Sequence, residues 1–139
     1  MFLDSAIRKG FFSALSGITL NSAVVPVYDT FALPEGQGHP YILLSTQTSS
    51  ERLVKECRMY DATILVDIVT GSLNPIGRFQ SEVIAEQVDN RVNDDINIDV
   101  DGWQLAQTNR ESVTDMGDKD EQYYIFRKLM RYSFKINKL

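Results

Sequence analysis

The chain has 139 residues and a formal net charge of −5 at neutral pH, with 43% hydrophobic and 24% charged residues. These values are typical of one globular domain with an ordinary core, so we expect residues 1–139 to form a single domain. No apolar run reaches the ~18 residues of a membrane span, so we expect no membrane contact. Asp4 interrupts the first apolar stretch, so we expect no signal peptide.

Charge is segregated along the chain. Residues 86–121 contain eleven acidic and three basic residues, whereas residues 122–139 contain five basic and no acidic ones. Two interpretations stay open: an acidic solvated loop beside a basic strand, or complementary patches through which copies of the chain meet head to tail. The acidic balance argues against a DNA-binding groove, because phosphate binding needs clustered Lys and Arg. The single cysteine, Cys57, excludes an intrachain disulfide.

The N-terminal segment predicts a helix followed by a short strand. Apolar residues recur there at spacings of three and four: Leu3, Ile7, Phe11, Leu15 and Ile18. This period predicts a helix over residues 3–18. A short strand is expected at 23–29, and Pro26 indicates that it lies at a sheet edge because proline cannot donate to a ladder. Strong breakers predict a loop over 30–40.

The middle of the chain predicts two strands and a helix. Residues 41–48 indicate a strand, and 49–57 a polar surface connection. Residues 58–70 alternate between an apolar and a polar face and are the clearest strand signal. Pro75 is well placed for the first turn of a helix that extends to about Val92.

The last third predicts three more strands, at 95–101, 103–108 and 122–137, with an exposed acidic hairpin at about 109–121. The closing strand places aromatic and apolar residues on one face and basic residues on the other. Lys128 and Leu129 fall out of phase, which indicates a bulge. The order of elements predicts an α+β fold: a mixed, mainly antiparallel sheet with two main helices packed on it and a long C-terminal strand.

The side chains do not point to catalysis. His39 is the only histidine, and it lies between Gly38 and Pro40, so no nucleophile–base pair is evident. The segment Asn97-x-Asp99-x-Asp101-Gly102 matches the first half of a calcium loop, but Thr108 stands where a bidentate Glu is required. We therefore predict no catalytic residue, no cofactor and no metal site.

The strongest candidate functional residues are charged. Arg127, Arg131 and Lys135 share one face of the closing strand. Such residues pair with acids on a neighbouring strand, for which Asp61 and Asp67 are candidates, or contact phosphates. Acidic and basic patches on one chain also suit contacts between subunits. The candidate interface residues are Asp99, Asp101, Arg127, Arg131 and Lys135.

The order of these segments resembles one viral protein family. A leading helix is followed by Pro26-Val27-Tyr28-Asp29, by a loop with Pro34 and Gly36, and then by Pro40-Tyr41-Ile42-Leu43-Leu44. A strand such as Ala62 to Val69, a helix near Pro75 and a closing strand rich in Tyr, Phe and Arg come later. This pattern is similar to the tail-terminator (tail-completion) proteins of long-tailed bacteriophages.

The resemblance implies a structural role in the virion, at the junction of tail and neck. Members form a hexameric ring, assembled in the host cytoplasm, on the head-proximal end of the tail tube. The ring stops polymerisation of the tube subunit and joins the neck. Its implied partners are itself, the tail-tube protein and the neck or connector protein, while DNA passes through without sequence-specific binding. The family brings no catalytic or cofactor residue.

Two other interpretations stay open. The chain could be a neck or head–tail connector subunit, or a tube subunit itself. A more distant alternative is a small ligand- or metal-binding α+β domain that uses Asn97, Asp99 and Asp101.

Overall fold

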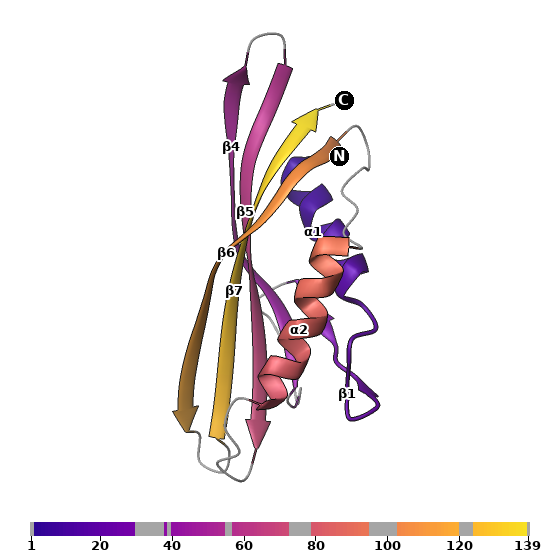
Figure 1. The fold of residues 1–139 in the computed structure, drawn as a ribbon, viewed down its shortest axis with the longest axis vertical. Coiled ribbons are helices and arrows are strands. Elements are labelled where there is room, and N and C mark those ends of the chain that lie inside the picture. Colours follow the sequence, from indigo (N-terminus) through magenta and orange to yellow (C-terminus); the bar gives the residue numbers. More distant parts are fainter. Residues whose placement is uncertain are drawn as a thin grey trace.

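The computed structural model, which describes residues 2–29, 38, 40–54, 57–72, 79–94, 103–119 and 124–138, is an α+β fold. Both helices lie on one side of a long twisted sheet (Figure 1). This arrangement confirms the predicted fold class. The elements are α1 (Leu3–Leu15), β1 (Thr19–Leu20), β2 (Ala23–Val24), β3 (Val27–Tyr28), β4 (Tyr41–Val54), β5 (Cys57–Ser72), α2 (Phe79–Asp94), β6 (Trp103–Lys119) and β7 (Tyr124–Lys138).

The main sheet has the strand order β3-β4-β5-β7-β6. Only β3 and β4 run parallel, and the other neighbours are antiparallel, as predicted. The four long strands have 14, 16, 17 and 15 residues, against a usual length of about 5–6. At one end of the sheet the β4–β5 pair diverges from β6 and β7, whereas at the other end β5, β7 and β6 lie side by side, with Ser72 and Lys119 both opposite Tyr124 (Figure 1). The molecule therefore presents strand ends at both extremes of its long axis.

Alternation along β7 builds one wall of the core. Met130, Tyr132, Phe134 and Ile136 are buried, and they face the same side as Ala62, Ile64 and Val66 of β5. The expected bulge in β7 was wrong: the β5–β7 register is continuous, so Lys128 lies on the core face in phase with these residues. The register shifts fall instead on β6, between Leu105 and Gln107 and between Arg110 and Ser112.

The two helices close the core from the same side. α1 buries its apolar stripe, and the Phe11 ring lies 5.3 Å from that of Phe134 and 6.1 Å from that of Tyr132. α2 contributes Ile84, Val88 and Val92. Each large apolar side chain fully buried in this way contributes about 1.5–3 kcal/mol to the stability of the fold.

β4 is longer than predicted. The polar segment 49–54, expected as a surface connection, continues the strand opposite β5. A register shift between Leu44 and Gln47 causes the difference, because it moves the side chains that follow to the opposite faces. Gln47 then faces α1, where its side chain accepts a hydrogen bond from Arg8 Nε at 2.8 Å and donates one to the Asp4 carbonyl at 3.0 Å.

β6 is also longer than predicted. The acidic stretch from 109, expected as a hairpin tip, is strand as far as Lys119 and pairs with β7 up to Tyr124. Its side chains are largely exposed, so their charges remain solvated while the backbone completes the ladder. Residues 120–121 of that hairpin and the predicted strand at 95–101 lie outside the described residues.

The segment expected as one strand at 23–29 forms two short strands, β2 and β3, and β2 pairs with β1 before it. Asn21 and Ser22 both have positive φ, 51° and 68°, and they turn β1 into β2. Such a pair of conformations is typical of two-residue hairpin turns. After Pro26, β3 joins the main sheet at its edge beside β4, and the Pro26 carbonyl accepts from Ile42 N at 2.9 Å.

Candidate functional site

The predicted basic residues of β7 lie on the outer face, by which we mean the side of the main sheet away from the helices. Arg127, Arg131 and Lys135 alternate with the buried positions, as predicted. Their environments differ, because the β5 residues opposite them differ.

Arg127 is held within its own chain. Its Nη2 lies 2.5 Å from Asp67 Oδ2 and its Nε lies 3.4 Å from Asp67 Oδ1. The hydrogen bond to Asp67 is the main cause that raises the pKa of Arg127 above its ordinary value. Burial raises the pKa of the nearby Tyr41 hydroxyl, an effect that the charge of Arg127 opposes. The predicted role of Asp67 as a partner of this strand is confirmed.

Arg131 and Lys135 have no such carboxylate partner among the residues that the structure describes. Arg131 Nη2 donates to Thr46 Oγ1 at 3.3 Å. Asp61 lies opposite Lys135 in the register, yet its carboxylate pairs with Arg52 at 2.9 Å. The prediction that Asp61 pairs with the basic strand is not confirmed by any ion pair. Both partners of Arg52–Asp61 are substantially exposed, so this pair adds little stability.

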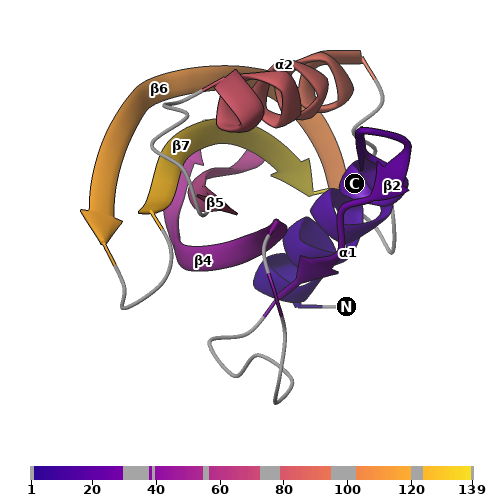
Figure 2. The ribbon, with the colours of Figure 1, turned by 90° about the horizontal axis from the view of Figure 1, so that it is seen from below.

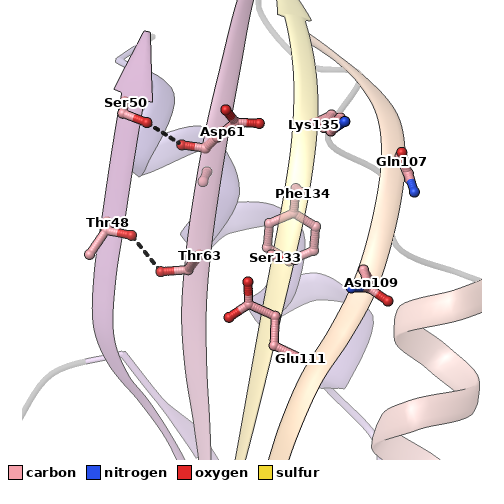
Figure 3. Close-up of a pocket in the computed structure, with 11 residues that line it drawn as sticks. Thr48, Ser50, Asp61, Thr63, Gln107, Asn109, Glu111, Ser133, Phe134 and Lys135 are labelled. Carbon is pink, nitrogen blue, oxygen red and sulfur yellow. Dashed lines mark hydrogen bonds between the residues drawn. The ribbon is translucent and has the colours of Figure 1, made fainter. Parts of the chain in front are cut away.

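An open polar depression of about 320 Å³ lies on the outer face around Lys135 (Figure 3). Its floor crosses four strands, from Thr48 on β4 to Glu111 on β6. Thr48 and Thr63 share a 2.5 Å hydrogen bond there. Its lining is Thr48, Ser50, Asp61, Ala62, Thr63, Gln107, Asn109, Glu111, Ser133, Phe134 and Lys135. Hydroxyl, amide and charged groups are here spread over an open surface. This arrangement suits contact with another polar surface more than chemistry on a small substrate.

A second polar cluster lies between α2 and the β6–β7 pair. Tyr132 donates to Asp89 Oδ1 at 3.0 Å, and Arg110 lies 3.2 Å from Asp89 Oδ2. Lys128, with a side chain only 8% exposed, lies 2.8 Å from Asp115 Oδ1. Burial, and then the hydrogen bond to Asp89, raises the pKa of Tyr132 well above its ordinary value. Each of these polar groups has a partner within the cluster, so none of them is buried without compensation.

The sequence did not reveal this cluster. Asp89 lies in the middle of a helix, and nothing in its neighbours indicates that it faces a tyrosine on a distant strand. The one available signal was Lys128, whose even number places it among the buried positions of β7. It was interpreted as a break in the alternation.

The remaining predicted sites cannot be placed. Asp99 and Asp101, proposed both as interface residues and as half of a calcium loop, lie outside the described residues, as does His39. Within the described part of the chain, no group of three or more His, Cys, Asp or Glu residues is arranged to hold a metal ion. No helix in that part is long and apolar enough to cross a membrane.

Comparison with known proteins identifies a shared fold. No family model matches the chain, and no curated protein matches it. A solved chain from the virion of a native gene transfer agent particle matches with a TM-score of 0.58 and 14% sequence identity. The alignment covers 96% of this chain and 91% of that one. The two chains therefore share one fold over nearly their whole lengths.

Proposed function

We propose that this chain is a non-enzymatic structural protein of a phage-like virion. The observation that carries the proposal is the fold shared end to end with a chain of the gene transfer agent virion. A match covering 96% of one chain and 91% of the other extends over nearly the whole architecture and not one common motif. Because one fold can serve many functions, the chain's own surfaces must support the role as well.

Within the virion, we propose the role of tail terminator: a hexameric ring on the head-proximal end of the tail tube, at the junction with the neck. The segments 26–29 and 40–44 that resemble this family form β3 and the start of β4, which pair in parallel at the edge of the sheet. A terminator must contact the tube on one side and the neck on the other. The long strands reach both ends of the molecule, which suits such a two-sided subunit (Figure 1).

The charged residues fit contacts between subunits more readily than chemistry. Lys135 on the open outer face is the best placed of the candidate interface residues, since Arg127 is already neutralised by Asp67. Asp99 and Asp101 stay candidates by their sequence position alone. The acidic balance of the chain also suits a ring through which DNA passes without binding, because like charges repel.

The alternatives in the same particle are a neck or connector subunit and a tube subunit. Electron microscopy of the purified chain separates them. We expect closed rings of one size that do not grow with concentration. Long tubes formed by this chain alone would instead identify a tube subunit, and rings that bind the neck protein but not the tube would identify a connector.

A further inference from the structure

The outward side of α1 carries exposed aromatic and basic side chains. Phe12 is 47% exposed although it lies in the middle of the helix, and Lys9 is exposed one turn before it. Ser5, Arg8, Lys9, Phe12 and Asp29 line an open depression of about 510 Å³, which we call the α1 face. Among the described residues that line it, the charged groups are two basic side chains and one carboxylate, that of Asp29. The α1 face is therefore apolar at Phe12 and positive around it.

The opposite character occurs in a groove between α2 and β6. This groove, about 270 Å³ in volume, is bounded by Glu82 and Glu86 of α2 and by Val113 of β6, which is 41% exposed, with Met130 beneath. We call it the α2–β6 groove. Its remaining charged residues are paired: Arg110 with Asp89 at 3.2 Å, and Lys128 with Asp115 at 2.8 Å.

The groove therefore keeps a net negative charge. Among the described residues, Glu82 and Glu86 form no ion pair, and both are exposed. Phe79, 71% exposed one turn before Glu82, extends the apolar surface along α2. Exposed aromatic side chains beside uncompensated charge are typical of an interaction surface.

We propose that the α1 face of one copy docks into the α2–β6 groove of the next copy. Phe12 packs against Val113, and Lys9 meets Glu82 and Glu86. A second copy of this chain is the occupant because the two surfaces are complementary in charge, and each carries an exposed apolar side chain. This inference rests on the proposed ring and names the surfaces that close it.

The positions of the two surfaces suit such a ring. They are built from different elements, so both can be occupied in one copy at once. Figure 2 shows that β6 ends on the side of the molecule away from α1. Two different patches in this arrangement make a heterologous contact, which closes into a ring when the rotation between copies permits it.

Charge reversal with rescue tests the contact. The variants are Lys9→Glu, Glu82→Lys, Glu86→Lys, and Lys9→Glu combined with each glutamate change. Assembly is measured by sedimentation velocity over a range of concentrations. We expect each single variant to raise the concentration of half-assembly about tenfold, and at least one combination to return it to within about threefold of the unaltered chain.

The matched control is Arg58→Glu, which makes the same charge change as Lys9→Glu on the exposed β4–β5 pair. It should assemble like the unaltered chain, and circular dichroism should show every variant folded. Normal assembly of the single variants, or the absence of any rescue, overturns the docking proposal and leaves the ring intact. An unaltered chain that stays monomeric throughout overturns the ring and the docking together.

Discussion

Arg127 of β7 and Asp67 of β5 form a two-pronged ion pair diagonally across the outer face of the sheet. The Asp67 side chain is only 4% exposed, whereas that of Arg127 is 45% exposed. The carboxylate has left water almost completely, so it depends on the guanidinium for compensation. Arg127 therefore contributes to the stability of the single subunit before it contributes to any contact between subunits.

Replacing Arg127 should cost more stability than replacing Asp67. Arg127→Met leaves a buried carboxylate without its cation and should lower the free energy of unfolding by about 1–3 kcal/mol, less than for a fully buried pair because Arg127 is half exposed. Asp67→Asn leaves a guanidinium that water can still solvate, so its loss should be smaller. Urea unfolding measures both, with Arg58→Met as the exposed control. Equal losses in the two variants would contradict this order.

The Lys128–Asp115 pair should show a similar asymmetry. Lys128 lies on the core face of β7, and its ammonium is almost fully buried against Asp115. Asp115→Asn leaves the Lys128 ammonium buried without its counter-charge and should destabilise the chain by about 1–3 kcal/mol. Lys128→Met fills the same space without a charge and should be close to neutral or stabilising. A Lys128→Met variant less stable than Asp115→Asn would show that the ion pair itself stabilises the fold.

Tyr132 should make stability depend on alkaline pH. Its pKa is raised in the folded chain by burial and by the hydrogen bond to Asp89, so folding favours the protonated hydroxyl. The resulting stability is fully present below about pH 10, the ordinary pKa of tyrosine, and is lost as the pH rises from there toward the raised pKa. The Tyr132→Phe variant has no hydroxyl proton at this position. The other tyrosines are the same in the variant and in the unaltered protein, so their ionisation affects both alike.

Urea unfolding at pH 8, 9, 10 and 11 therefore separates the two chains. At pH 8 the free energy of unfolding of Tyr132→Phe should be about 1 kcal/mol lower than that of the unaltered chain, because the hydrogen bond is missing. This difference should become smaller above pH 10. A gap that stays constant across this series would show that Tyr132 ionises equally in the folded and unfolded chain.

Phe11 and Phe12 are neighbours with opposite roles. Phe11 is fully buried against Tyr132 and Phe134, so Phe11→Ala should cost about 3–5 kcal/mol of unfolding free energy. Phe12 is 47% exposed, so Phe12→Ala should change the stability of the monomer by less than about 0.5 kcal/mol. Unfolding at concentrations too low for assembly measures both. Comparable losses would mean that α1 does not pack as the structure shows.

The parts of the fold that could be predicted from the sequence are those with an unbroken period. The apolar pattern of β7 alternates without interruption from Met130 to Ile136, and that of α1 repeats every three or four residues, so both elements were predicted to within a few residues. β4 and β6 were predicted too short because register shifts change which face each side chain occupies. A period-two pattern cannot continue through such a shift.

The candidate site could be predicted only in part. Arg127 and Asp67 were matched because both belong to strands with clear alternation. Asp61 was predicted as a partner of the same basic strand, but it pairs with Arg52, which lies in the segment that was not expected to be a strand. The role of Asp89 depends on how α2 rotates against the sheet, a tertiary relationship that local spacing does not encode.

The measurement that tests the proposed role most directly is the length of tail tubes polymerised from the tube subunit with and without this chain. Electron microscopy would record both the tube lengths and the tube ends. We expect the chain to bind one end as a closed ring, to stop growth there, and not to enter the tube wall. Unchanged growth with bare ends, or incorporation of the chain along the tube, would contradict this expectation.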